Sequence, residues 1–142
     1  MRILFGGSFD LLHTGHVRAM RKAKRLDDYL IVLAVSDEEA SHKKGKQRPI
    51  IPQEERVEML NALRIVDEVY AEKGLHNMRK VLQAVEPDVL VLNTDARKED
   101  VELCAEMGVM VRFIDRQIPS SGLDTSKIIK RILERYDSRD IS

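Results

Sequence analysis

The sequence holds a single cysteine, no net charge and no long apolar run. One cysteine, Cys104, excludes a disulfide within the chain and a zinc site built from several cysteines. It lies in an apolar-periodic stretch, where we expect a small core residue. Lysine plus arginine balances aspartate plus glutamate at 24 each, so overall charge does not indicate a nucleic-acid partner. No apolar run approaches the roughly 20 residues that cross a bilayer, so no membrane partner is expected.

The length and the N-terminal residues predict one compact domain. A chain of 142 residues with 43% hydrophobic content can bury one sizeable core. No linker or low-complexity stretch divides it, so we expect a domain over residues 1–136 and a polar tail over residues 137–142. Residues 1–5 have the pattern of a strand that ends at glycine, not of a signal peptide, which predicts a cytoplasmic location.

Hydrophobic periodicity predicts alternating strands and helices. Strands are expected over residues 3–5, 29–35, 66–70, 89–92 and 109–114. Helices are expected over residues 14–26, 52–64, 78–85, 101–107 and 124–133, and a polar loop over residues 36–48. This alternation predicts an α/β, Rossmann-like single domain with a five-stranded parallel sheet and helices on both faces. Ligands of such sheets bind beyond the carboxyl ends of the strands, where the strand order reverses.

The loop after the first strand, Gly6 to His16, suits a phosphate ligand. Its glycines let the backbone approach a ligand closely, and the helix that follows presents free N–H groups. His13 and His16 are three residues apart at the mouth of that helix, so their rings can share one side. Two histidines could also bind a metal, but Asp10 is the only evident third ligand.

Other nucleotide-binding and catalytic patterns are missing. A dinucleotide fingerprint, G-x-G-x-x-G, and a P-loop are both absent. No serine or cysteine has a visible activating partner for covalent catalysis. Two basic clusters, residues 42–48 and 127–131, belong to loops or helix starts at the ligand-binding edge of the predicted sheet, which favours a phosphate-binding role over a merely solvated surface.

The motif Gly7-Ser8-Phe9-Asp10 followed by His13-Thr14-Gly15-His16 resembles the HxGH nucleotidyltransferase superfamily. Leu11-Leu12, in place of a proline after Phe-Asp, resembles its cytidylyltransferase-like branch. The resemblance extends through residues 23–30, 49–56 and 125–128, and within the branch it includes glycerol-3-phosphate cytidylyltransferase and archaeal FAD synthetase-type members. It implies that residues 1–136 form a nucleotidyltransferase domain in which a phosphorylated small molecule attacks the α-phosphorus of a nucleoside triphosphate.

The resemblance also implies roles for individual residues. His13 and His16 would donate hydrogen bonds to the leaving pyrophosphate, while Lys43 and Lys46 would act with them as catalytic residues on the reacting phosphates. Acceptor binding is expected at Asp10, Lys44 and Arg56. Nucleotide binding is expected at Gly7, Ser8, Phe9, Asp10, Gly15, Asn93, Asp95, Thr125 and Ser126. Mg²⁺ would accompany the triphosphate without a protein ligand set of its own, and a homodimer is expected.

Departures from the family pattern leave the nucleotide open. The family commonly has G-x-D after the fourth strand, where it reads the base or ribose; this chain has Asn93-Thr94-Asp95. Asp124 replaces a serine and Ile129 a basic residue near the last motif, and Asp27 replaces a glycine. The leading hypothesis is transfer from CTP to an acceptor such as glycerol 3-phosphate. The alternatives are transfer from ATP to flavin mononucleotide (FMN) or a sugar phosphate and, in another class, an inactive nucleotide-binding regulator.

Overall fold

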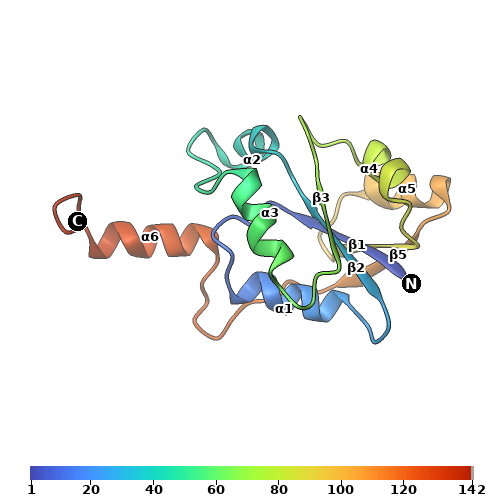
Figure 1. Cartoon of the computed structure of the whole chain (residues 1–142), viewed down its shortest axis with the longest axis horizontal. Coiled ribbons are helices and arrows are strands. Elements are labelled where there is room, and N and C mark those ends of the chain that lie inside the picture. Colours follow the sequence, from blue (N-terminus) through green and yellow to red (C-terminus); the bar gives the residue numbers. More distant parts are fainter. Residues whose placement is uncertain (142) are drawn as a thin grey trace.

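The protein is built on a five-stranded, all-parallel sheet, seen in a computed structural model that describes residues 1–141 (Figure 1). The strands are β1 (Arg2–Gly7), β2 (Tyr29–Ala34), β3 (Glu68–Ala71), β4 (Val89–Asn93) and β5 (Met110–Ile114), in the spatial order β3-β2-β1-β4-β5. Register is regular: Ile3 pairs with Leu30 on one side of β1 and with Val89 on the other. The fold class predicted from the sequence is confirmed.

Helices cover both faces of the sheet. They are α1 (Thr14–Ala23), α2 (Asp37–Lys44), α3 (Gln53–Asn61), α4 (Met78–Val85), α5 (Lys98–Met107) and α6 (Thr125–Arg135). Alternate residues of β1 divide the core, because successive side chains of a strand point to opposite faces. Ile3 packs in a cluster with Met20 of α1 and Leu60 of α3. Leu4 packs in the other cluster, with Val81 of α4 and the fully buried Cys104 of α5, which confirms the core position expected for that cysteine.

One helix lies where the sequence predicts a loop. Residues 36–48 were expected to be a polar loop, but α2 occupies Asp37–Lys44. Its sequence has almost no apolar periodicity, and the capping and charged residues at its two ends stabilise it instead. The hydroxyl of Ser36 accepts a hydrogen bond from the N–H of Glu39 at 2.9 Å, with acidic residues in the first turn and basic residues in the last. The prediction of a loop is therefore wrong. Capping and charged residues stabilise this helix, and hydrophobic periodicity gives no signal for it.

Other helix ends follow local signals, although α1 ends earlier than predicted. Asp27 adopts φ 68°, a left-handed conformation that aspartate tolerates. Gly108 ends α5 at φ 73°. Asp124 is the N-cap of α6 and accepts a hydrogen bond from the N–H of Lys127 at 2.8 Å. Helix α1 ends at Ala23, three residues earlier than predicted, and Leu26 is 92% exposed.

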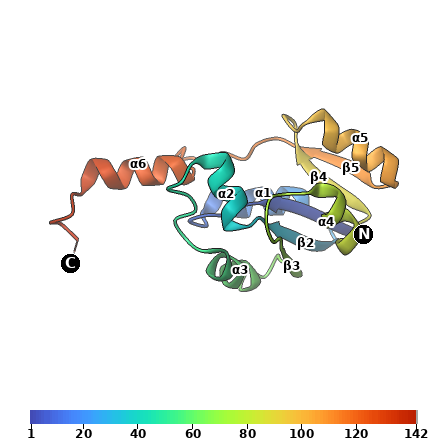
Figure 2. The same ribbon diagram turned by 90° about the horizontal axis from the view of Figure 1, so that it is seen from above.

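The last helix projects from the body of the domain. In Figures 1 and 2, α6 extends away from the sheet, on the side opposite the N-terminus. None of its residues is buried, and Ile132 and Leu133 are exposed. The exposed residues 137–141 follow it, and Ser142 of the expected tail lies outside the described residues. Within residues 1–141 no helix has the length and apolar content needed to cross a membrane.

Candidate active site

A cavity of about 620 Å³ opens at the carboxyl ends of β1 and β4. The strand order reverses between these two strands, so the cavity lies where parallel sheets of this kind bind ligands. Its walls come from the end of β1 and the loop after it, from Asn93 at the end of β4, and from residues 116–119 and 122–127. We call this cavity the nucleotide cavity.

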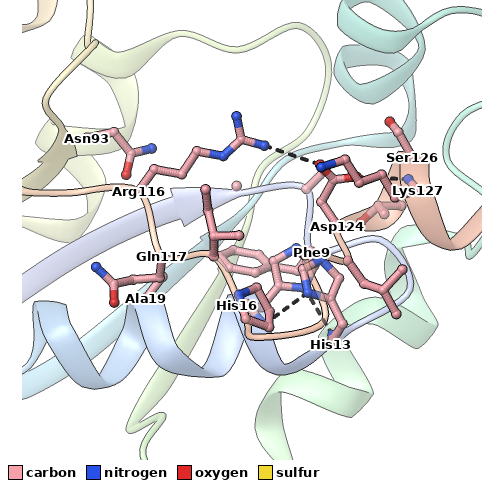
Figure 3. Close-up of a pocket in the computed structure, with 18 of the residues that line it drawn as sticks. Phe9, His13, His16, Ala19, Asn93, Arg116, Gln117, Asp124, Ser126 and Lys127 are labelled. Atoms are coloured by element: carbon pink, nitrogen blue, oxygen red, sulfur yellow. Dashed lines mark hydrogen bonds and ion pairs between the residues drawn. The ribbon is translucent and has the colours of Figure 1, made fainter.

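His13 and His16 form a reciprocal cap at the start of α1 (Figure 3). The Nδ1 atom of His13 accepts a hydrogen bond from the N–H of Gly15 at 3.1 Å, and Nδ1 of His16 accepts one from the N–H of His13 at 3.2 Å. The two ring centroids are 3.8 Å apart. Because each Nδ1 is an acceptor, the proton of each neutral ring resides on Nε2. Both histidines line the nucleotide cavity and can donate to a ligand there from Nε2.

The two histidines are neutral at physiological pH. Burial lowers the pKa of His16 to about 4, with the proximity of His13 acting in the same direction and Asp10 opposing both. Burial also lowers the pKa of His13, opposed by the carboxylate of Asp124. The rings therefore act as hydrogen-bond donors without a full positive charge.

Two buried polar side chains hold the loop from behind. The guanidinium of Arg56, 1% exposed, donates to the carbonyl of Ser8 at 2.6 Å and to the carboxylate of Asp37 at 2.6 Å. Asp10, 2% exposed, accepts hydrogen bonds from the backbone N–H groups of Ile50 and Ile51 at 2.7 and 3.0 Å. Neither side chain lines the nucleotide cavity. The structure thus places both in the scaffold of the loop, and the substrate contacts expected of them stay a prediction.

That scaffold holds an unusual backbone. Phe9 and Leu11 have φ of 53° and 50°, in the left-handed region that residues other than glycine rarely adopt. Phe9 is 4% exposed, and its ring packs edge-on against the ring of His16 at a centroid distance of 5.3 Å. Strain of this kind persists only where the surroundings over-determine the conformation, and the bonds of Arg56 and Asp10 supply that constraint.

The N-terminus of α6 forms the opposite wall. The hydroxyl of Thr125 donates to the carbonyl of Asp10 at 2.8 Å, and Arg48 donates to the hydroxyl of Ser126 at 2.8 Å. The first bond docks the helix start onto the loop of the histidines, and the second joins it to the segment after α2. Thr125, Ser126 and Lys127 of the first helical turn line the same cavity as the histidines. The structure therefore brings Thr125 and Ser126 to the histidines, as the sequence predicted.

The predicted lysines separate in space. Lys44 lines the nucleotide cavity, Lys43 lines a second cavity of about 370 Å³, and Lys46 is exposed and lines neither. The second cavity lies toward α4 and shares Phe5, Gly6, Gly7 and Asn93 with the first. Asp95 belongs to the second cavity alone. Asn93 therefore lines both cavities, whereas the sequence predicted a nucleotide contact alone for this residue.

Sequence reasoning missed Arg116 and the residues after it. Arg116, Gln117 and Ile118 follow β5 and line the nucleotide cavity. Arg116 lies 3.4 Å from the carboxylate of Asp124, and Figure 3 draws this contact. The signal that could have found it is its position: Arg116 lies two residues after the end of β5, and the segment after a parallel strand emerges at the ligand-binding edge.

The cavity provides cationic groups and N–H donors but few metal ligands. Within residues 1–141 no three side chains of His, Cys, Asp or Glu gather closely enough to hold a metal ion. Lys44, Arg116 and Lys127 carry positive charge on its walls, and Asp124 is the carboxylate among the lining residues. Such an arrangement suits an anionic, phosphate-rich ligand.

Gly15 is required by the close approach of the His13 ring to its backbone. A Cβ atom added there would lie 2.8 Å from Cε1 of His13, closer than atoms can pack. The glycine of the H-x-G-H motif thus leaves room for the cap.

Comparison with known proteins identifies the family of the chain. Residues 4–131 match the family model described as cytidylyltransferase-like. The chain is 38% identical to the FAD synthase of Thermococcus kodakarensis, over 96% of this chain and 94% of that one. It is 36% identical to the FAD synthase of Pyrococcus abyssi, over 96% and 95%. Among solved structures it is similar to a lipopolysaccharide core biosynthesis protein from Thermoplasma volcanium, with a TM-score of 0.65, 26% identity, and 82% of this chain and 96% of that one covered.

The paired histidines, the helix starts that face them and the match over most of the chain agree with one another. The chain belongs to the cytidylyltransferase-like family and is a nucleotidyltransferase.

Proposed function

We propose that this enzyme transfers the adenylyl group of ATP to FMN, forming FAD and pyrophosphate. The relatives named FAD synthase support this choice, since they match over nearly their whole length. They favour the ATP-using alternative over CTP and glycerol 3-phosphate, the leading hypothesis from the sequence, for which the comparisons give no support.

The second cavity is the observation that supports FMN as the acceptor. It is the right size for part of a small ligand, since such pockets occupy about 300–1,000 Å³. Its apolar lining comes from Leu33, Val35, Met78, Leu90, Val91 and Leu92. This apolar part of the lining suits the face of a planar flavin ring, which glycerol phosphate lacks. The polar part, which includes Lys43, Asn93 and Asp95, suits the polar groups of the acceptor. We call this space the acceptor cavity.

The two cavities meet at Gly6 and Gly7, where the reacting phosphates would come together. An oxygen of the FMN phosphate attacks the α-phosphorus of ATP. The bond from that phosphorus to the bridging oxygen breaks, and pyrophosphate leaves with the bonding electrons. The attacking phosphate is ionised at neutral pH, so it needs no general base. Alignment and charge stabilisation then supply the catalysis.

The residues around the meeting point support this chemistry. Nε2–H of His13 and His16 would stabilise charge on the leaving pyrophosphate, and Thr125, Ser126 and the start of α6 would bind its outer phosphates. Lys44 and Lys43, which line the two cavities, would neutralise the α-phosphate and the acceptor phosphate. Lys46, Gly7, Ser8, Phe9, Gly15, Asn93 and Asp95 keep their predicted contacts with the substrates as part of this proposal.

A magnesium ion fits this site as a companion of the triphosphate. The carboxylate of Asp124 lines the nucleotide cavity but already caps α6 and pairs with Arg116. Phosphate oxygens and water would thus provide most of the ligands, as Mg²⁺ prefers. When bound, the ion would neutralise charge on the triphosphate.

The remaining expectations are proposals too. We propose a homodimer, supported by the exposed apolar residues Ile132 and Leu133 on α6 and Tyr136 directly after it, because apolar surface of this kind is what dimers bury. The cytoplasmic location stays a prediction.

Pyrophosphate release tests the substrates directly. Each of four nucleoside triphosphates is paired with FMN, glycerol 3-phosphate or a sugar 1-phosphate, and the product is identified by mass spectrometry. We expect ATP with FMN to give the highest kcat/KM, by at least about tenfold over any other pair, and FAD as the product. A higher kcat/KM for CTP with glycerol 3-phosphate would refute the proposal. Nucleotide binding without release for any pair would favour the regulator instead.

A further inference from the structure

Beside the acceptor cavity lies a hydrogen-bonded cluster that the transfer chemistry does not use. It consists of Glu39, Glu72, His76 and Asn77, and both glutamates are 5% exposed. Buried carboxylates are costly unless hydrogen bonds satisfy them. Every one of their bonds goes to the segment after β3, which leads into α4, so the cluster fixes that segment.

The ring of His76 is held by one nitrogen. Nδ1 lies 2.8 and 3.0 Å from the two carboxylate oxygens of Glu72. A carboxylate can only accept, so Nδ1 carries the proton. The same carboxylate accepts from the N–H of Asn77 at 2.9 Å, and Glu39 accepts from the N–H of His76 at 3.0 Å.

The segment is anchored beyond these side chains as well. Gln53 donates from its side-chain amide to the carbonyl of Glu72 at 2.7 Å, and Ser36 donates to the carbonyl of Gly74 at 2.6 Å. Backbone and side chain of His76 are both fixed, which is the preorganisation that a recognition residue needs.

The other ring nitrogen, Nε2, is not used by the cluster. His76 lines the acceptor cavity together with Met78 of α4, and both residues also border a more open pocket between α4 and α5. Among the described residues, Nε2 has no hydrogen-bond partner, and no buried side-chain nitrogen or oxygen is left unpaired. Nε2 therefore retains solvent-accessible surface. With Nδ1 donating to Glu72, Nε2 is the ring nitrogen left to accept a hydrogen bond, on a wall that also holds the apolar side chain of Met78.

We propose that His76, oriented by Glu72, recognises the flavin acceptor by accepting a hydrogen bond from the imide N–H of its ring system at Nε2. This inference rests on the proposed function. Glycerol phosphate and sugar phosphates have no imide, so the contact selects a flavin. His76 is thus a specificity-determining residue, and Glu72 is a positioning residue that acts through it.

Substitution of His76 by asparagine tests this contact. The side-chain amide of His76→Asn can still donate to Glu72, but it lacks any atom at the Nε2 position. We expect its KM for FMN to rise about tenfold, the loss expected for one net hydrogen bond, with the KM for ATP and the melting temperature unchanged. Glu72→Gln should raise the KM for FMN by a smaller factor. Glu58→Gln is the matched control for Glu72→Gln, because Glu58 of α3 is exposed and lines neither cavity.

An FMN analogue methylated at the imide nitrogen closes a double-mutant cycle. Methylation should raise the KM of the wild-type enzyme about tenfold and have little further effect in His76→Asn. An equal methylation penalty in both proteins would overturn the proposal. So would a normal KM for FMN in His76→Asn together with a lower melting temperature, which would indicate a structural role. Absence of FMN turnover by the wild-type enzyme would instead refute the proposed function, and this inference with it.

Discussion

At the scale of single residues, His13 and His16 can combine two tasks. Each ring caps a backbone N–H with Nδ1, which leaves Nε2–H to donate to a ligand in the proposed mechanism. Because burial keeps the rings neutral, attraction of the nucleotide depends on the cationic groups around them, Lys44, Arg116 and Lys127. In the proposed mechanism, therefore, the cationic residues attract the nucleotide and the two histidines donate hydrogen bonds in the transition state.

The lowered pKa of His16 predicts acid sensitivity of the fold. The unfolded chain protonates this histidine near its ordinary value of 6.5, whereas the folded chain resists protonation until about pH 4. Between these values the unfolded state binds more protons, so stability falls as the pH falls. Urea titrations should show the free energy of unfolding decrease by up to about 3 kcal/mol across this window from His16 alone.

His16→Gln separates this effect from the titration of carboxylates. Glutamine at the third position of a helix serves in a capping box, so this variant can keep the cap without a titrating ring. We expect its loss of stability between pH 6.5 and 4 to be smaller than that of the wild-type protein. Equal losses in the two proteins would assign the acid sensitivity to other groups.

The sequence made some of these residues predictable and others not. The two histidines could be predicted because their spacing and the adjacent glycine are local features. His76 and Glu72 could not, since their pairing depends on a non-helical segment held by Glu39 and Gln53 from distant parts of the chain. Arg116 belongs to a loop without periodicity, so only the placement of β5 gives it a role.

At the scale of elements, hydrophobic periodicity located every helix that packs on the core. It missed α2, where Ala40 and Glu39 are the buried residues and the caps supply the stability. For α6 it located the helix but implied that the apolar face of the helix is buried, which is not the case. An amphipathic pattern predicts a covered apolar face, yet Leu133 is 73% exposed and Ile132 44%. A pattern within one chain cannot distinguish burial against its own domain from burial against another molecule.

The exposed face of α6 predicts how the proposed homodimer is held. Light scattering should give twice the mass of one chain for the wild-type protein. Leu133→Lys places a charge in this face and should weaken the dimer at least about tenfold, because a buried leucine contributes about 1.5–3 kcal/mol. Glu134→Gln changes the net charge by the same amount beside this face and should leave the mass unchanged. A monomeric wild-type protein, or a dimer indifferent to Leu133→Lys, would contradict this arrangement.

At the scale of the whole molecule, the alternation of elements was enough to predict the sheet and the edge at which ligands bind. Strand order follows from the handedness of the crossovers and from the reversal between β1 and β4. The division of that edge into two cavities could not be predicted in the same way. It depends on where Lys43, Lys44 and Asn93 fall relative to Gly6 and Gly7, which is a matter of packing.

Gly6 and Gly7 line both cavities and so form a wall that the cavities share. If the enzyme makes FAD, as proposed, the adenylate of this product would lie in one cavity and its flavin in the other, so FAD would bind as a bivalent ligand. Once one half is bound, the other binds intramolecularly at a high effective concentration. We expect FAD to inhibit competitively against both substrates, with an inhibition constant at least about tenfold below either KM.

Initial rates measured at several FAD concentrations test this expectation, and an inhibition constant above both KM values would show that the two cavities bind independently. If the product does bind in this way, its release limits turnover. The enzyme then slows as FAD accumulates and recovers as FAD is withdrawn by the proteins that use it. Product supply would be self-limiting through the geometry of one shared wall, with no separate regulatory site.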